Sequence, residues 1–448
     1  MTHLQGYKKD AVKAPILIIL EVICELLLPL VMAQIVDTAI PSGDVQYIFQ
    51  MGAIMLLLAG IYMLCGVLAA KYAAFASQGF GGNLRQCLFD KVQEFSFADI
   101  DRFSSASLIT RMTNDVNAMT MMLAMGLRML VRAPVMLVAA VIISVTLNAR
   151  LALILLVVIP LMVLVIGILM KMCTKLFEVM QTKIDGLNNT LQENLVAIRV
   201  VKAFVREDYE NEKFSSASQN LYRLFVKAEG LLAFNGPAMM LAVYFCIIMV
   251  SWLGAHFIVV DHTLATTDLT SLYSYIMSLL MSLMMLSMVV VMISMSMASI
   301  RRIQEVLEET PDLHNPEHPV TEVADGSIDF DHVNFSYKHG SGKNALSDID
   351  LHIRSGETIG VIGGTGSGKS SLVNLICRLY DVDEGSVCVG GVDVRQYDME
   401  SLRNQVSVVL QKNTLFSGTI LENLRWGNPD ATEEECVEAC RAARADEV

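Results

Sequence analysis

The chain has 448 residues, of which 54% are hydrophobic and 18% are charged, and its mean hydropathy is +0.50. Such a composition excludes an ordinary soluble protein and predicts a membrane protein of two or three domains. The net charge of −13 argues against a nucleic acid as a partner. Nine scattered cysteines without a C-x-x-C pair predict neither a disulfide framework nor a zinc site.

Six apolar segments are each long enough to cross a bilayer, which takes about 20 residues. They are residues 15–40, 47–70, 125–147, 151–170, 238–260 and 271–298. Lysine and arginine gather before the first span, in the long connections 71–124 and 171–237, and after the last span. Because positive residues favour the cytoplasmic side, this pattern predicts a multi-pass protein of the cytoplasmic membrane with both termini in the cytoplasm.

The two long connections are polar but keep a helical pattern, as Leu187, Leu191 and Leu195 show in the second one. At about 1.5 Å per residue, half of the connection 71–124 folded as a helix reaches about 40 Å. The spanning helices are therefore predicted to continue far beyond the membrane before the chain turns back.

Two carboxylates, Glu21 and Glu25, lie four residues apart on one face of the first span. Because a charge inside a membrane is costly, these side chains should face protein or water. One hypothesis is that they recognise cationic substrates. The alternative is a polar contact at the cytoplasmic end of the span, exposed to the water of an inward-facing cavity.

Methionines recur at spacings of three and four residues along the sixth span, and these spacings place them on one helix face. They are Met277, Met281, Met284, Met288, Met292 and Met295. Flexible, polarisable methionine suits a surface that accepts many apolar shapes. The alternative is that the stripe faces lipid or packs against another helix.

The pattern changes after Ser299, which divides the chain into a membrane domain at 1–299, a linker at 300–325 and a second domain at 326–448. Prolines 311, 316 and 319 mark the linker. Alternating apolar residues then predict strands, and Thr432 with Glu435 predicts a capping box that opens a helix. The predicted strands are residues 328–337, 346–353, 358–362, 386–389 and 406–410.

The segment from Gly363 to Ser370 fits G-x-x-x-x-G-K-[ST]. The apolar run 358–362 precedes it as a predicted buried strand, and 371–379 follows it as a predicted helix, which is the context of a phosphate-binding loop. The alternative is an ordinary turn rich in glycine and serine. The residues predicted to hold the phosphates are Gly363, Gly364, Thr365, Gly366, Ser367, Gly368, Lys369, Ser370 and Ser371.

The chemistry of a polyphosphate requires these residue types. Glycines allow several backbone N–H groups to point at one anion, and the N-terminus of the following helix adds a positive dipole end. Lys369 supplies a cation for the outer phosphates, and Ser370 offers a hydroxyl to Mg²⁺. The loop therefore predicts a polyphosphate with Mg²⁺ as its ligands.

The order of these parts resembles the ABC exporter family, and the resemblance covers nearly the whole chain. It implies an all-α six-helix transmembrane domain plus an α/β P-loop nucleotide-binding domain, and it implies that the polyphosphate is ATP. Phe335-Ser336-Tyr337 looks like the A-loop, which implies that Tyr337 stacks on adenine, although an ordinary strand aromatic is the alternative. The segment 409–416 looks like the Q-loop, which implies that Gln411 reaches Mg²⁺, although a solvated loop glutamine is the alternative.

The resemblance also implies a function. The chain is similar to one half of a heterodimeric multidrug exporter, whose partner is a second half-transporter and whose substrates are lipophilic or amphiphilic. Turns near 102–108 and 204–209 resemble the coupling turns that link nucleotide binding to the spanning helices. The sequence shows no signature motif, Walker B carboxylates or switch histidine, so no catalytic residue is expected within it and hydrolysis by this chain alone is not expected. An ATP-gated channel or regulatory ABC protein, and a non-catalytic fragment, are the alternatives.

Overall fold

The computed structural model describes residues 4–261, 264–337, 344–410 and 414–445. The chain forms two compact units. The helical unit comprises Met1–Glu94 and Phe103–Thr310, and the mixed unit comprises Phe95–Arg102 and Pro311–Val448. A short segment of the first long connection thus belongs to the mixed unit.

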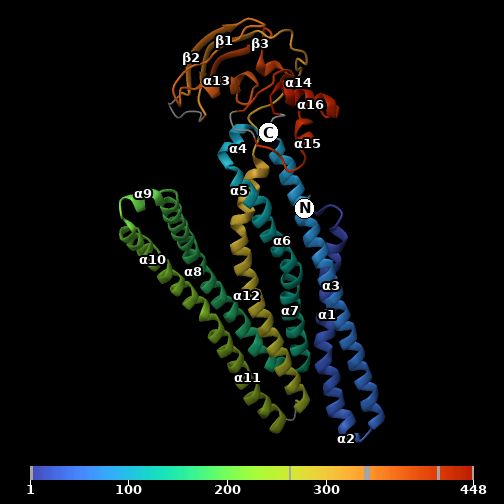
Figure 1. Ribbon diagram of the computed structural model, residues 1–448. Helices are drawn as coiled ribbons and strands as arrows, with labels where there is room; N and C mark the ends of the chain where they lie inside the picture. Colours follow the sequence, from blue (N-terminus) through green and yellow to red (C-terminus); the bar gives the residue numbers. More distant parts are fainter. Residues whose placement is uncertain (1–3, 262–263, 338–343, 411–413, 446–448) are drawn as a thin grey trace. The chain divides into compact units, whose positions relative to one another are not determined.

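The described residues of the helical unit form helices joined by short turns (Figure 1), and six helical stretches among them are long and apolar enough to cross a membrane, as predicted. The first half of the unit contains α1 (Lys8–Gln34), η2 (Ile35–Ala39), α2 (Ile40–Ser42), α3 (Val45–Gln93), α5 (Ser105–Thr110), η3 (Arg111–Asp115), α6 (Val116–Met125), η4 (Gly126–Leu130) and α7 (Val131–Leu147). The second half contains α8 (Ala149–Val196), α9 (Ile198–Ala203), α10 (Glu207–Ala233), α11 (Asn235–Val259) and α12 (Thr266–Glu308).

Polar caps fix where the longest helices begin. The Asp44 carboxylate accepts a hydrogen bond from the backbone N–H of Tyr47 at the start of α3, and the Asn148 side chain accepts from two N–H groups at the start of α8. Helix α3 has 49 residues, or about 74 Å, and α8 has 48 residues. Both exceed the thickness of a bilayer, so the predicted continuation of the spanning helices beyond the membrane is confirmed.

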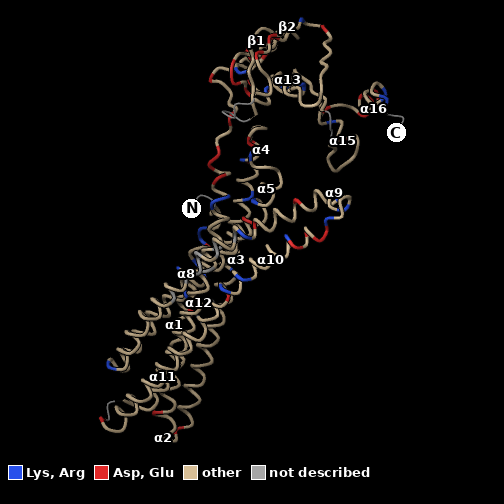
Figure 2. Tube along the Cα trace, turned by 90° about the vertical axis from the view of Figure 1, so that its left-hand side faces the viewer, with Lys and Arg blue, Asp and Glu red and all other residues tan. Residues whose placement is uncertain are grey.

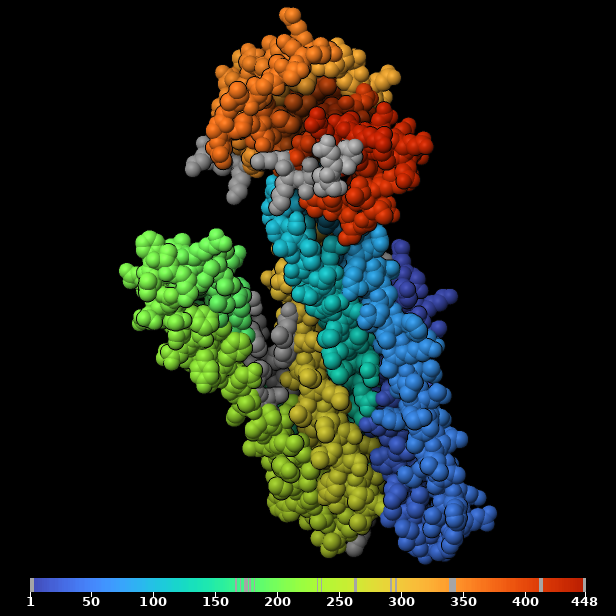
Figure 3. All heavy atoms as spheres, in the orientation of Figure 1, coloured from blue at the N-terminus to red at the C-terminus, as the bar shows by residue number. Residues whose placement is uncertain are grey.

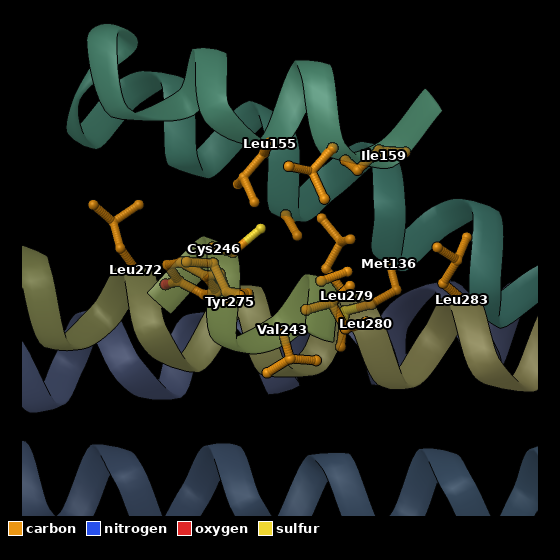
Figure 4. Packing of buried hydrophobic residues seen from close by; sticks show 14 of the residues in the cluster. Met136, Leu155, Ile159, Val243, Cys246, Leu272, Tyr275, Leu279, Leu280 and Leu283 are labelled. Atoms are coloured by element: carbon orange, nitrogen blue, oxygen red, sulfur yellow. The ribbon is translucent and has the colours of Figure 1, made fainter. Parts of the chain in front are cut away.

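The core of the helical unit lies where α1, α7, α8, α11 and α12 meet (Figure 4). Tyr275 on α12 is fully buried there, and its hydroxyl donates a 2.9 Å hydrogen bond to the backbone oxygen of Leu26 on α1. Large apolar side chains such as Leu56 and Leu241 instead point outward and are 77% and 72% exposed. An apolar outer surface of this kind suits contact with lipid.

Within the helical unit, α8 and α10 diverge from α12 toward the end that carries α9, and the helices converge at the other end (Figures 1 and 3). Figure 2 shows few charged residues along the convergent part and many near α9. The convergent part therefore has the character of a membrane-spanning bundle, and the α9 end that of a water-exposed extension.

The mixed unit contains a four-stranded antiparallel sheet with strand order β2-β1-β3-β4. The strands are β1 (Ile328–Phe335), β2 (Leu346–Ile353), β3 (Glu384–Val389) and β4 (Val392–Asp393). Ile328 pairs with Ile353 on one side and with Val389 on the other. The helices are α4 (Phe97–Phe103), α13 (Lys369–Ile376), η5 (Val394–Gln396), α14 (Met399–Gln405), α15 (Ile420–Leu424) and α16 (Glu433–Ala442).

The strands predicted at 346–353 and 386–389 are confirmed, and the first predicted strand ends at Phe335. The predicted capping box of Thr432 and Glu435 is also present at the start of α16. The strands predicted at 358–362 and 406–410 are wrong. A strand needs a neighbouring strand for its backbone hydrogen bonds, and no described strand pairs with either run. The two runs are also not packed into a core, since Ile362 and Val409 are 98% and 90% exposed.

Candidate nucleotide-binding site

The predicted phosphate-binding loop lies directly before α13. Gly366 and Gly368 adopt φ angles of +82° and +88°, which residues with a Cβ rarely adopt. A Cβ on Gly368 would lie 2.8 Å from the backbone oxygen of Ala345, so backbone from a neighbouring segment occupies that space. Glycine at 368 therefore satisfies both the conformation of the loop and its close packing.

Lys369, the first residue of α13, folds back over the loop. Its ammonium donates hydrogen bonds of 2.8 Å and 2.7 Å to the backbone oxygens of Gly363 and Gly364. A positive charge is thus held at the positive end of the α13 dipole, and no acidic residue occupies the first turn of this helix. Such a combination attracts an anion.

Tyr337 lies beside the same loop, although it is more than 30 residues away in sequence. Its hydroxyl is 2.9 Å from the hydroxyl of Ser371 in the first turn of α13. Ser371 is buried, whereas Ser370 is exposed and free to face a ligand. The structure thus places Tyr337 beside the predicted loop residues 363–371. The other predicted site residue, Gln411, lies outside the described residues.

The ring of Tyr337 belongs to an aromatic cluster. It meets the rings of Phe335 and Tyr380 edge to face, with centroids 4.9 Å and 5.1 Å away. Its position is reinforced by Asp383, whose carboxylate accepts hydrogen bonds of 2.6 Å and 2.9 Å from the N–H and hydroxyl of Ser336. Tyr337 is nevertheless 47% exposed, so one face of the ring can accept a flat ligand.

Sequence reasoning missed Tyr380 and its partner on α4. The Tyr380 hydroxyl donates a 2.9 Å hydrogen bond to Asp101, and its ring lies 6.2 Å from that of Phe97. Burial and this hydrogen bond raise the pKa of Tyr380 well above its usual range, so the phenol remains a donor. Phe335, Tyr337, Tyr380 and α4 together line a cavity of about 490 Å³.

The carboxylates predicted at Glu21 and Glu25 both bind Arg132 of α7. Its two terminal nitrogens lie 2.5 Å and 2.6 Å from Glu21 Oε1 and Glu25 Oε2. All three side chains are largely buried, with exposures of 12%, 27% and 23%. Sequence reasoning missed Arg132. Because a charged residue inside a predicted span is costly without a partner, its position in the third span could have indicated an ion pair with the two glutamates.

Four methionines of the predicted stripe are exposed on the helical unit, Met292 is half-buried, and the side chain of Met295 lies outside what the structure describes. Met277, Met281 and Met288 are 50%, 62% and 67% exposed, and Met284 is 38% exposed. This exposure fits a surface that meets lipid, a partner or an apolar ligand.

The loop residues fit a nucleotide polyphosphate. Positive-φ glycines, an ammonium and a helix N-terminus converge on one exposed segment, and an exposed hydroxyl at Ser370 adjoins them. A metal ion that binds together with the nucleotide would contact both the Ser370 hydroxyl and the phosphate oxygens. The described residues include no cluster of three His, Cys, Asp or Glu side chains that could hold a metal ion by itself.

Comparison with known proteins agrees with this geometry. Residues 12–284 match the family described as the ABC transporter transmembrane region, and residues 346–447 match the family described as ABC transporter. The uncharacterised ABC transporter ATP-binding protein YfiB of Bacillus subtilis is 35% identical over 447 residues, which cover 100% of this chain and 78% of that protein.

Two mycobacterial proteins are also similar. An uncharacterised ABC transporter ATP-binding protein of Mycobacterium tuberculosis is 35% identical across 99% of this chain and 77% of its own length. A protein of Mycobacterium bovis named fatty acid ABC transporter ATP-binding/permease protein is 31% identical across 81% of this chain and 57% of its own length. The chain belongs to the ABC transporter family, as a multi-pass membrane protein that fuses a transmembrane domain to an ATP-binding domain.

Proposed function

We propose that this chain is one subunit of an ATP-driven exporter, which couples ATP binding and hydrolysis to the efflux of lipophilic or amphiphilic substrates across the cytoplasmic membrane. The observation that carries the proposal is the phosphate-binding loop at Lys369, in the same compact unit as α4 from the membrane-side connection. The proposed nucleotide site and a segment of the first long connection thus belong to one compact unit.

In this proposal the residues have separate roles. Tyr337 stacks on the adenine, the backbone of 363–368 donates to phosphate oxygens, and Lys369 exchanges its bonds to the loop carbonyls for bonds to the outer phosphates. Ser370 and Gln411 would hold Mg²⁺, which when bound would supply positive charge for phosphoryl transfer. The contacts of Lys369 and Tyr337 support these roles because both side chains already lie against the loop.

Coupling would pass through α4. This helix is continuous in sequence with α3 before it and α5 after it, and Tyr380 holds it through Asp101. When the nucleotide orders the loop and Tyr337, the edge-to-face contact between Tyr337 and Tyr380 transfers the change to α4. The spanning helices would then shift between two packings.

A partner subunit is part of the proposal. The loop residues 361–367 are exposed in the isolated chain, so one face of a bound triphosphate would remain open to a second nucleotide-binding domain. A heterodimer is favoured by the resemblance, and a homodimer is the alternative. Positive residues around the spans support termini on the cytoplasmic side.

An amphiphilic substrate is supported by the apolar surface of the helical bundle and by the similarity to the Mycobacterium bovis protein named a fatty acid ABC transporter. An ATP-gated channel or regulatory protein would use the same nucleotide site without uphill transport. A non-catalytic fragment would bind nucleotide without turnover.

The test uses inside-out vesicles that contain this chain and its partner subunit. BODIPY-labelled dodecanoate and rhodamine 6G serve as an anionic and a cationic amphiphile. We expect ATP-dependent accumulation against a gradient for at least one probe, and we expect Lys369→Met to abolish it. Lys213→Met, which removes an exposed ion pair to Glu193 on α8, is the matched control and should retain activity within about twofold. Passive equilibration of both probes would instead favour a channel or a fragment.

A further inference from the structure

The helical unit contains an open cavity of about 350 Å³ at the edge of its core, with Ile18 shared between the two, and no residue of the nucleotide loop lines it. Its walls come from α1, α3, the segment from α6 to α7, and α12. Ala70, Ala73, Ala74, Ser77 and Gln78 form the α3 wall, and the small side chains of the three alanines and the serine leave space there. A volume of this size accommodates a small ligand or the head and first carbons of a larger one.

The lining is apolar with a few charges. Met125 and Met129 contribute from the segment that joins α6 to α7, and Met285 contributes from α12. Methionine adapts to apolar ligands of different shapes because its side chain is flexible and polarisable. The charged side chains at the lining are Glu21, Arg128 and Arg132.

The charges differ in whether they already have partners. Glu21 is bound to Arg132, and Arg132 is also bound to Glu25, so both terminal nitrogens of Arg132 are occupied. Arg128 is exposed at the cavity lining and makes no ion pair or hydrogen bond within the described part of the chain. A cation within an apolar span without a partner has a strong electrostatic reason to meet an anion.

Backbone geometry places Arg128 at the cavity. It lies in η4, a five-residue π-helical turn between α6 and α7, and Arg132 follows one turn later in α7. A π-helical turn shifts the side chains that follow it relative to those before it, and such turns are frequent at functional sites. Here both arginines reach the same cavity.

We propose that this cavity binds the head of an anionic amphiphile, whose carboxylate, sulfonate or phosphate pairs with Arg128 while its chain lies against Met125, Met129 and Met285. This inference specifies the substrate class of the proposed exporter and rests on that function. A cationic head is disfavoured because it would have to displace Arg132 from carboxylates that it already holds at 2.5 Å and 2.6 Å. The anion instead meets a guanidinium that is available for a charge-assisted hydrogen bond.

The experiment measures equilibrium binding to the purified chain in nanodiscs of phosphatidylcholine, without nucleotide. Three probes share a twelve-carbon chain: dodecanesulfonate is anionic, dodecyltrimethylammonium is cationic and dodecanol is neutral. The native chain should bind the sulfonate most tightly. Arg128→Gln should weaken sulfonate binding by about tenfold, as expected for one hydrogen bond to a charged group, and leave dodecanol binding unchanged.

Charge reversal sharpens the test. Arg128→Glu should bind the trimethylammonium probe more tightly than the sulfonate, and Arg128→Lys should retain the preference for the anion. Arg150→Gln is the control because Arg150 is an exposed arginine of the helical unit that does not line the cavity. Equal sulfonate affinity in Arg128→Gln and the native chain, or a native preference for the cation, would overturn the proposal.

A second variant tests the cavity itself. Ala74→Phe places a large ring at the α3 wall and should abolish saturable binding of both dodecanol and the sulfonate. Retained binding in this variant would contradict the assignment of the site. A further measurement uses nanodiscs that contain phosphatidylglycerol and identifies the source of the anion. Weaker dodecanesulfonate binding in these nanodiscs indicates that a lipid headgroup competes for the site, and unchanged binding indicates a freely exchanging amphiphile.

The binding assay is independent of ATP. Lys369→Met should therefore bind dodecanesulfonate like the native chain even though it loses transport. A failure of the exporter function would appear in the vesicle assay alone, and a failure of the anion site would appear in the nanodisc assay alone.

Discussion

At Gly368 of the phosphate-binding loop, both the backbone conformation and the surrounding space restrict which side chain the position can hold. Its φ of +88° is a left-handed conformation, and the space where a Cβ would lie is filled by the backbone of Ala345. Gly364, in the same loop, has open space around its Cα and no positive φ. Two glycines of one motif therefore have different physical reasons to be glycine. Gly368 sets the shape of the loop, whereas Gly364 leaves room for a ligand.

This difference gives a matched pair of variants. Gly368→Ala should destabilise the nucleotide-free protein by about 2 kcal/mol or more, because an L-residue in the left-handed region costs roughly 1–2 kcal/mol and the backbone contact adds to it. Gly364→Ala should change stability by no more than about 0.5 kcal/mol. Calorimetric melting of the two variants without nucleotide measures the effect, and equal melting temperatures would contradict the assigned role of Gly368.

At the scale of elements, β1 and β2 are joined by two histidine–aspartate pairs across the strands. His332 on β1 lies 2.7 Å from Asp348 on β2, and His352 on β2 lies 2.8 Å from Asp329 on β1. The hydrogen bond that His332 donates to Asp348 raises the pKa of His332, and the hydrogen bond that His352 donates to Asp329 raises the pKa of His352. The four side chains are between 39% and 75% exposed, so solvent weakens each pair.

The sign of the pH effect follows from these raised values. A histidine with a raised pKa in the folded state contributes stability that is complete below its unfolded pKa of about 6.5 and is lost as pH rises through the folded pKa. We expect the melting temperature of the mixed unit to fall modestly between about pH 6 and pH 8. In a variant with His332→Gln and His352→Gln this slope should be smaller, and an unchanged slope would exclude the two pairs as its source.

The link between Tyr380 and α4 is the second element-scale feature. Tyr380→Phe removes the hydroxyl that donates the hydrogen bond, and Asp101→Ala removes the carboxylate that accepts it. We expect ATP affinity to change by less than about twofold and ATP-dependent transport to fall by about three- to tenfold. The double variant should be no worse than either single variant, because both remove the same contact.

Tyr222→Phe, at an exposed tyrosine on α10, is the control for these substitutions and should behave like the native chain. Additive losses in the double variant would indicate that Tyr380 and Asp101 act separately. A parallel loss of ATP affinity would place Tyr380 in the nucleotide site rather than in the connection to α4.

Features that depend on nearby residues could be predicted from the sequence, and features that depend on distant partners could not. The loop at Lys369 and the capping box at Thr432 are set within a few residues, and both are present. The runs 358–362 and 406–410 were predicted as strands from their apolar residues alone, but a strand also requires a paired neighbour.

Long-range contacts show the same limit. The Arg132–Glu21 pair joins residues 111 positions apart, and the Tyr380–Asp101 bond joins residues 279 positions apart. A single sequence gives the charge in the span but not its partner. The membrane domain itself was predictable because bilayer thickness and hydropathy act on each segment independently.

At the scale of the whole molecule, the chain passes between the helical and mixed units three times. It enters and leaves the mixed unit around α4, and it enters again after α12. Any movement of the mixed unit therefore acts on the ends of α3, α5 and α12 together. Within the helical unit, α8 and α10 diverge from α12 toward α9, which leaves these helices able to change their separation (Figure 1).

The most direct test of this coupling measures a distance inside the helical unit while nucleotide binds to the mixed unit. Spin labels on unnatural amino acids at Ile109 of α5 and Val200 of α9, both exposed, avoid the nine native cysteines. We expect saturating ATP to shift the distance distribution by several ångströms in the complete transporter, and Lys369→Met to abolish the shift. An unchanged distribution, with ATP binding verified by calorimetry in the same sample, would contradict a mechanical link between the phosphate-binding loop and the spanning helices.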